Sequence, residues 1–346
     1  MIQAGSGEKI YTSAKMAATV EALVAEGVPV AAALEGVGVS QSVLTSSTTR
    51  VSIDQIVTCY HNAARLTRDP YFALHLGQKI HLSTYGLYGF ALLSGTDFRR
   101  IMQTAVTYHR LVAPLAAITF HEEGDRAAWS MTPIAHPRID AAMYRFLVEL
   151  QIGTHWSLMR DVMGHRFAPR EIALTFTPPG DSAAYQAAFG RPVLFNRPRN
   201  ELVFDSAHLD QRPEYGNEIS HSSVIELCES LMADLELSAG TAGKVREILV
   251  LNLMRPTSFD MVASRLHMTT RTLRRKLDQE NTSFRKLVDE LKMQVAIKYL
   301  RDTELPMDDI AHSLGFSEAA IFRRAFKRWT NTGPREFRGG RHSVRN

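Results

Sequence analysis

The chain contains 346 residues, 45% of them hydrophobic and 22% charged, and its formal net charge is +4. This length allows two or three domains, each with its own hydrophobic core. The two cysteines, Cys59 and Cys228, are too few for a disulfide framework, so we expect small buried side chains in a reducing cytosol. No stretch has the pattern of a signal peptide or a membrane span, and we expect a cytoplasmic protein without a membrane partner.

The first 215 residues combine helical and strand-like periodicity. Helical patterns lie at about 13–26, 52–67, 70–78, 97–112, 138–163 and 181–188. Strand-like runs lie at Leu115–His121, Ala127–Thr132, Glu171–Thr177 and Glu201–Phe204. Together they predict an α+β domain over residues 1–215, with helices covering the sheet.

This N-terminal region shows little sign of reaction chemistry. It contains no HExxH, GxSxG, Walker or GxGxxG motif. Gly86 and Gly89 favour a turn or close packing over a phosphate-binding loop. Tyr108, His109 and Trp129 could line a pocket, but ordinary packing is the more frequent role of such side chains. We therefore expect no enzyme, no metal site and no cofactor, and the sequence does not identify an effector.

Residues 216–243 are predicted to link two domains. They include a helix-like segment, followed by a run of small residues from Ser238 to Gly243 that is the best linker candidate. The charge changes sign here. Residues 244–346 contain 21 Lys and Arg against 12 Asp and Glu, a net charge of +9, whereas the preceding residues carry −5. The basic region is expected to bind phosphates by counterion release, with an affinity that falls as salt rises.

This basic region, residues 244–346, contains a duplicated helix-turn-helix pattern. The first copy covers about 259–281 and the second about 307–331. Leu273 of the first copy corresponds to Phe322 of the second, 49 residues later. The apolar positions recur at helical spacing and should form the core of each copy, which leaves mostly cationic side chains for solvent.

Local signals mark the ends of these helices. Thr257 is predicted to start a capping box before the first helix, and Thr269 and Ser317 are predicted to cap the second helix of each copy. Asn281 and Asn331 follow those second helices, and asparagine tolerates the left-handed conformation that often ends a helix.

A single helix is predicted between the two copies, over residues 283–301. Leu287, Leu291, Val295 and Leu300 lie close to one helical stripe. Nineteen residues at about 1.5 Å each span roughly 28 Å. This length is close to one turn of B-DNA, about 34 Å, so one rigid helix could present both second helices to successive segments of the major groove.

The region from about Lys244 to Arg338 resembles the DNA-binding domain of the AraC/XylS family of bacterial transcription regulators. The most specific part is IAHSLGFSEAAIFRRAFKRWTNTGPREFR, which matches the family signature over nearly its whole length. The match includes the turn at Gly315 and the core pair Phe322 and Phe326. Asn331 stands where many members carry glycine, a departure that its capping role tolerates.

Upstream, about residues 14–215 resemble the N-terminal effector domain called the arabinose-binding type. The segments YFALHLGQKI and STYGLYGFALLSGTDF carry part of this resemblance. The label implies a sensing domain and does not imply that arabinose is the effector.

The residues expected to bind DNA lie on the second helix of each copy. The predicted base-reading residues are Thr270, Arg271 and Arg274 in the first copy and Ala319, Ala320, Arg323 and Arg324 in the second. Arginine suits bidentate contact with guanine, whereas Ala320 offers only a methyl group and should read bases more weakly. The resemblance implies DNA-facing positions for Arg271, Arg275, Ala320 and Arg324. The predicted phosphate contacts are Thr269, Lys276, Ser317, Lys327 and Arg328.

The alternative for each arginine is a solvated helix face or an ion pair with Asp278, Glu280 or Glu318. The duplication and the charge of +9 together favour DNA binding over this alternative.

We therefore expect a transcription regulator that binds double-stranded promoter DNA and responds to a small-molecule effector. The resemblance implies activation of a nearby operon and contact with RNA polymerase, although repression is equally compatible with these residues, and a homodimer is compatible with the mechanism. In one alternative, the N-terminal domain only mediates assembly and DNA binding is constitutive. In another, an enzyme is fused to a DNA-binding domain, which the missing catalytic motifs disfavour.

Overall fold

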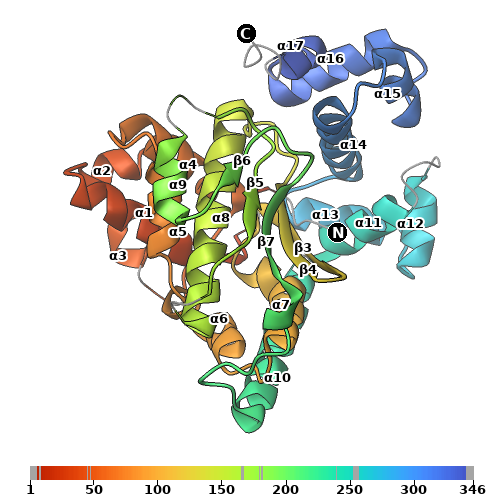
Figure 1. Cartoon of the computed structure of the whole chain (residues 1–346). Coiled ribbons are helices and arrows are strands. Elements are labelled where there is room, and N and C mark those ends of the chain that lie inside the picture. Colours follow the sequence, from red (N-terminus) through yellow and green to blue (C-terminus); the bar gives the residue numbers. More distant parts are fainter. Residues whose placement is uncertain are drawn as a thin grey trace. The chain divides into compact units, whose positions relative to one another are not determined.

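The computed structural model describes residues 6–7, 9–44, 46, 48–164, 167–178, 180, 182–238, 240–251 and 257–339 (Figure 1). The chain forms two compact units. The N-terminal unit comprises Lys9–Ile134 and Ala142–Ala233, and the C-terminal unit consists mainly of Asp234–Asn346. The first combines helices with a sheet and the second is helical, in agreement with the predicted fold classes.

The helices of the N-terminal unit run from α1 to α10 and include three short 3₁₀ helices. Their bounds are α1 Ala14–Ala25, α2 Val30–Ala33, α3 Gln41–Leu44, α4 Ile53–Leu66, α5 Phe72–Lys79, η1 Leu82–Tyr85, α6 Gly86–Leu93, α7 Phe98–Tyr108, η2 His109–Leu111, α8 Ala141–Met163, α9 Ala183–Phe189, η3 Ser206–His208 and α10 Glu218–Ser238. The start of α4 shows how the sequence sets an end. The Ser52 side chain accepts from the Gln55 backbone N–H, while the Gln55 side chain accepts from the Ser52 N–H.

The described strands form a pair, β1 Tyr11–Thr12 and β2 Arg50–Val51, and a larger sheet. The larger sheet contains β3 Ala116–Glu123, β4 Arg126–Pro133, β5 Glu171–Ala173, β6 Val193–Leu194 and β7 Asn200–Asp205, in the order β3-β4-β7-β5-β6. Its pairs are antiparallel except for β5 with β6. β5 is shorter than predicted because the Thr175 N–H donates to the side chain of Asn200, 2.9 Å away, instead of continuing the ladder.

Helix α8 lies between this sheet and the layer that contains α1, α4 and α5 (Figure 1). Its side chains are buried around most of its circumference. Gly153 of α8 meets Gly77 of α5 at a close crossing, where a Cβ atom on Gly77 would lie 2.4 Å from the backbone oxygen of Leu150. Only glycine allows the two backbones to approach this closely.

The segment around Gly86 and Gly89 forms a turn and the helix α6, which was not among the predicted helices. Gly86 has a φ of +51°, and a Cβ atom on Gly89 would lie 1.9 Å from the backbone oxygen of Leu82. The preference for a turn or close packing over a phosphate-binding loop is therefore confirmed. Helix α6 was missed because it contains two glycines, and glycine is a poor helix former.

Both cysteines are fully buried and free, as expected of small packed side chains. Burial raises the pKa of the Cys59 thiol to about 12, which keeps it protonated and unreactive. No helix within the described ranges is sufficiently long and apolar to cross a membrane.

The C-terminal unit contains α11 Gly240–Leu251, α12 Phe259–Arg265, α13 Thr270–Gln279, α14 Phe284–Asp302, α15 Met307–Ser313, α16 Ala319–Thr330 and α17 Pro334–Gly339 (Figure 1). Two hydrophobic clusters hold it together. In the first, Leu287 and Leu291 of α14 pack with side chains of α11, α12 and α13. In the second, Ile297 and Leu300 of α14 pack with side chains of α15 and α16. Helix α14 thus contributes to both clusters.

The helix-like segment predicted within residues 216–243 is confirmed. Helix α10 occupies most of it, ending at Ser238, and α11 begins at Gly240. Gly240 has a φ of +59°, and the carboxylate of Glu280 accepts from the N–H groups of Thr241 and Ala242, at 2.7 Å each. Small residues suit this close contact with Glu280. The role of residues 238–243 as a linker stays a prediction, and Ala239 within it lies outside the described residues.

Candidate DNA-binding surface

Helix α13 buries leucines on one side and exposes arginines elsewhere. Leu273 and Leu277 are 0% and 1% exposed, whereas Arg271, Arg274 and Arg275 are exposed. Since successive residues advance by about 100° around a helix, Arg271 and Arg275 point directly away from the leucines. Arg274 lies on the flank, where its guanidinium stands 5.7 Å from the centre of the Phe259 ring of α12. This contact orients Arg274 against the preceding helix.

Helix α16 repeats this arrangement with aromatic side chains in the core. Phe322 and Phe326 are fully buried, and their ring centres are 5.7 Å apart. Arg323 and Arg324 are exposed. By the same rotation, Arg324 lies opposite the phenylalanines together with Ala320, and Arg323 lies on the flank.

The first residue of each helix is less available than predicted. Thr270 and Ala319 are both half-buried, and Ala319 packs against the second hydrophobic cluster. Their positions on the helix explain this placement, because each lies nearer the buried side than the arginines do. Ala320 is also half-buried, although it lies on the open side.

The predicted phosphate-contacting residues also differ in exposure. Thr269 and Ser317 are exposed, and so are Lys327 and Arg328, while Lys276 is half-buried. Arg328 forms an ion pair with Asp289 of α14 at 3.2 Å. The described ion pairs include none that joins an arginine of α13 or α16 to Asp278, Glu280 or Glu318.

The helix starts agree with the predicted caps in only one case. Thr269 is the N-cap of α13, and its hydroxyl oxygen accepts from the Thr272 N–H at 3.1 Å. The prediction for Ser317 is wrong, because α16 begins after Glu318, whose extended backbone places it at the N-cap without a side-chain hydrogen bond. The prediction for Thr257 is also wrong. The cap of α12 is Ser258, which accepts from the Met261 N–H.

The turns inside the two helix pairs require a left-handed residue at equivalent positions. His267, between α12 and α13, has a φ of +52°, and Gly315, between α15 and α16, has a φ of +71°. Phe316 follows Gly315, and the Lys292 ammonium of α14 lies 4.6 Å from its ring centre. Asn281 and Asn331 have φ values of +54° and +59°, as predicted for residues that end α13 and α16.

The three residues considered for an effector pocket are all buried. Tyr108 ends α7, His109 lies in η2 and Trp129 lies in β4. Trp129 lines a small cavity with His155 of α8, and the ring centres of these two residues are 4.4 Å apart. Tyr108 and His109 do not line that cavity, so their predicted packing role is the better description.

Comparison with known protein families identifies both parts of the chain. Residues 27–213 match the arabinose-binding domain of AraC transcription regulators, which covers more than half of the chain. Residues 262–340 match a helix-turn-helix domain. The chain belongs to the AraC family of transcription regulators. Its C-terminal unit is the DNA-binding region of this AraC-family protein.

Individual relatives of this AraC-family chain are bacterial regulators. An ornithine utilization regulator from Pseudomonas aeruginosa is 29% identical and aligns over 91% of this chain and 93% of its own length. The transcriptional regulator VqsM from the same species is 30% identical over 78% of this chain and 84% of its own. The crystal structure of CdpR, also from P. aeruginosa, aligns over 81% of this chain and 90% of its own, with 24% identity and a TM-score of 0.46.

Proposed function

We propose that this AraC-family protein reads two adjacent DNA sites with α13 and α16 and that a small molecule bound to its N-terminal unit controls this activity. The observation that carries the proposal is the exposure of Arg271, Arg275 and Arg324 on helix faces opposite buried leucines and phenylalanines. Arginine is the side chain best suited to bidentate contact with the O6 and N7 atoms of guanine. The helix pairs α12–α13 and α15–α16 then act as two helix-turn-helix units.

Helix α14 supports a reading of two sites by one chain. It contains 19 residues, which span roughly 28 Å at about 1.5 Å per residue. One turn of B-DNA is about 34 Å. A helix of this length, packed against both pairs, is suited to hold α13 and α16 at successive major-groove segments on one side of the duplex.

Phosphate contacts are proposed for the cations and hydroxyl groups beside the reading faces. Lys327 and Thr269 are exposed there, and Arg328 is available if its ion pair with Asp289 opens. Such contacts position the protein without specifying sequence. The net charge of +9 over residues 244–346 should make the affinity fall steeply with salt.

The effector is proposed to act by favouring one of two states that differ in dimerisation or in the docking of the two units. A ligand shifts such an equilibrium only through its different affinity for the two states. Activation through contact with RNA polymerase in the cytoplasm is the role that the family implies, and repression would use the same DNA contacts. A reporter gene behind the chain's own promoter distinguishes the two by the sign of its response.

The test is a fluorescence-anisotropy titration of the full-length protein against the DNA upstream of its own gene. Random DNA of equal length serves as competitor, and the titration is repeated with a metabolite panel that includes ornithine, because the relative from P. aeruginosa is named for ornithine utilization. We expect tight, salt-sensitive binding that the competitor does not remove and that one metabolite changes.

Two other outcomes would contradict parts of the proposal. Specific binding that no metabolite changes, together with unchanged melting temperatures across the panel, would favour constitutive DNA binding with an N-terminal unit that only mediates assembly. Equal affinity for upstream and random DNA would contradict sequence-specific reading by α13 and α16.

A further inference from the structure

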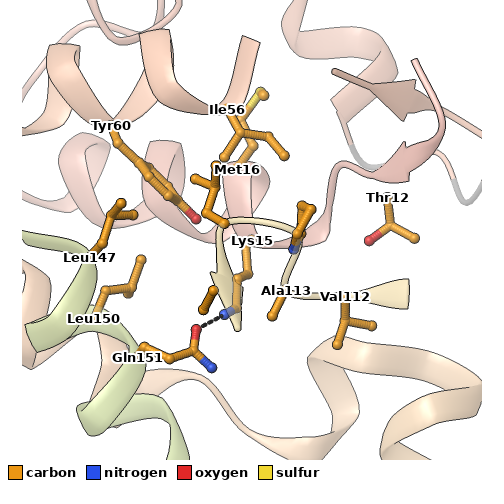
Figure 2. A pocket seen from close by; sticks show the side chains of 13 residues that line it. Thr12, Lys15, Met16, Ile56, Tyr60, Val112, Ala113, Leu147, Leu150 and Gln151 are labelled. Carbon is orange, nitrogen blue, oxygen red and sulfur yellow. Dashed lines mark hydrogen bonds between the residues drawn. The ribbon is translucent and has the colours of Figure 1, made fainter. Parts of the chain in front are cut away.

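A pocket in the N-terminal unit is lined mostly by apolar side chains. They come from α1, α4, α8 and the segment 112–116, and include Met16, Ile56 and Leu147. The cavity itself has a volume of about 30 Å³, and the space around it reaches about 440 Å³ only when the gaps between atoms and the adjoining open solvent are included. Figure 2 shows the Lys15 side chain reaching into the middle of this pocket, with the Tyr60 hydroxyl group also directed toward it.

Lys15 is an unusual residue for such a place. It is 9% exposed, and its ammonium donates one hydrogen bond, to Oε1 of Gln151 at 2.9 Å (Figure 2). An ammonium group has three N–H donors. Among the described residues, Gln151 accepts a hydrogen bond from this ammonium. No ion pair between described residues includes Lys15. A buried charge without an opposite charge is costly in a protein interior.

The other described groups around Lys15 do not supply a negative charge. Its ammonium lies 5.6 Å from the centre of the Tyr85 ring. Burial lowers the pKa of His109 and lowers that of His155 to about 3, so both rings are neutral at pH 7. Burial also raises the pKa of Tyr60 and of Tyr85, so both phenols stay protonated.

Lys15 also stands at the start of α1, where the helix dipole is positive. The first turn of α1 contains no acidic residue, and the N-cap Ser13 gives no side-chain cap within the described structure. The Ser13 hydroxyl instead donates to the backbone oxygen of Leu44 at 2.8 Å. The lysine and the helix start therefore both favour an anion at this end of the pocket.

Burial alone lowers the pKa of Lys15 to about 7, compared with 10.5 for an exposed lysine. At neutral pH the group is therefore close to half protonated. A bound anion would favour the protonated form and restore its charge.

We infer that this pocket binds a small organic carboxylate, with the carboxylate paired to Lys15 and the apolar body of the ligand against Met16, Ile56 and Leu147. The inference rests on the proposed function, since it identifies the class of effector. The ligand would join α1 to α8, because Lys15 and its partner Gln151 belong to these two helices. An ionised carboxylate accepts a shorter and stronger hydrogen bond from an ammonium group than a neutral acceptor does.

The test is isothermal titration of the full-length protein, without DNA, with butanoate, hexanoate, octanoate and phenylacetate. Each acid is compared with its neutral primary amide, which has almost the same shape. We expect at least one acid to bind tenfold or more tightly than its amide in the wild type, and this preference to disappear in Lys15→Met. Equal binding of acid and amide, an unchanged preference in Lys15→Met, or no binding by any acid would each overturn the inference.

Two variants distinguish the loss of the binding site from a loss of folding. Lys15→Met should melt at a higher temperature than the wild type, because methionine fills the space without a buried charge. Lys79→Met removes the same charge from an exposed position on α5 and should keep the preference for the acid. A Lys15→Met protein that melts at a lower temperature than Lys79→Met would contradict the view that Lys15 is an uncompensated buried charge.

The pH dependence gives an independent readout. Between pH 7 and pH 9 a carboxylic acid stays ionised while Lys15 loses its proton, so the affinity for the acid should fall by about tenfold or more. His109, His155, Tyr60 and Tyr85 keep their protonation states over this range, and so does the buried thiol of Cys59. An affinity that is independent of pH would contradict a role for Lys15.

This test is independent of the DNA titration. Acid binding with no specific DNA binding would uphold the pocket and contradict the proposed function. Specific DNA binding without acid binding would do the reverse.

Discussion

The two helix pairs of the C-terminal unit share one plan but reach it with different residues. The first pair has leucines in its core, a hydroxyl cap at Thr269 and arginines at both positions opposite the core. The second has phenylalanines in its core, no side-chain cap on α16 within the described structure, and an alanine in place of one of those arginines. Under the proposed function, the first pair therefore offers two arginines for base contacts and the second offers one.

The turns show the same division. His267 of the first pair adopts a left-handed conformation at a position where the second pair has Gly315. A residue with a Cβ atom adopts this conformation at a cost that glycine avoids. The first pair thus accepts backbone strain that the second does not.

The largest expected effect is at Arg324, the one arginine opposite the core of α16. Arg324→Ala should weaken binding to the specific promoter by about 1–3 kcal/mol, because it removes the second pair's main base contact. Anisotropy titrations on promoter and random DNA measure this change. An equal loss on both DNAs would mean that Arg324 contacts phosphate and does not read a base.

The next effect tests the turns. Gly315→Ala should lower the free energy of unfolding by about 1–2 kcal/mol. A Cβ atom on Gly315 would lie 3.8 Å from Nζ of Lys292, an ordinary contact distance, so the cost comes from the backbone conformation. His267→Gly should have the opposite sign and a smaller size, because glycine also gains entropy in the unfolded state. Urea midpoints of the full-length variants measure both. A stabilising Gly315→Ala would contradict the strain argument.

A smaller difference is expected at the helix caps. Thr269→Ala should cost about 1 kcal/mol of stability because it removes the hydrogen bond to the Thr272 N–H. Ser317→Ala should change stability by no more than about 0.5 kcal/mol, because Ser317 lies before the cap and is exposed. Matching losses in the two variants would show that Ser317 has a structural role after all.

The smallest effect on sequence discrimination is expected at Lys327. Lys327→Ala should weaken binding to all DNA alike and reduce the salt slope by about one unit. The ratio of promoter to random affinity should stay constant across a series of salt concentrations. A change in that ratio would place Lys327 among the base-reading residues.

The sequence predicted the C-terminal unit better than the N-terminal pocket, for a physical reason. The faces that hold Leu273, Arg271 and Arg324 follow from helical periodicity, which acts over a few residues. The cap prediction at Ser317 was wrong by one residue. The exact end of a helix depends on one or two backbone angles, which the residue type restricts only weakly. Glu318 lies at the cap, and its side chain is not a typical cap.

Lys15 was not predicted as a site residue. A lysine in an amphipathic helix is usually solvated, and its burial here depends on α8, whose Gln151 is 136 residues away in the chain. The available signal was local but weak. Lys15 is four residues before the buried Thr19 and next to the buried Met16, so it lies beside the apolar stripe of α1.

Helix α14 sets the distance between the two proposed DNA-contacting helices, α13 and α16. One end of α14 packs in the first hydrophobic cluster and the other end packs in the second. An insertion of one residue in its middle would rotate all following side chains by about 100° and pull Ile297 and Leu300 out of the second cluster. Single substitutions on α13 or α16 can change which bases are preferred, whereas the distance between the two sites cannot change without damage to a core. Promoters recognised by variants of this protein should therefore diverge in base sequence while keeping the spacing between their two half-sites.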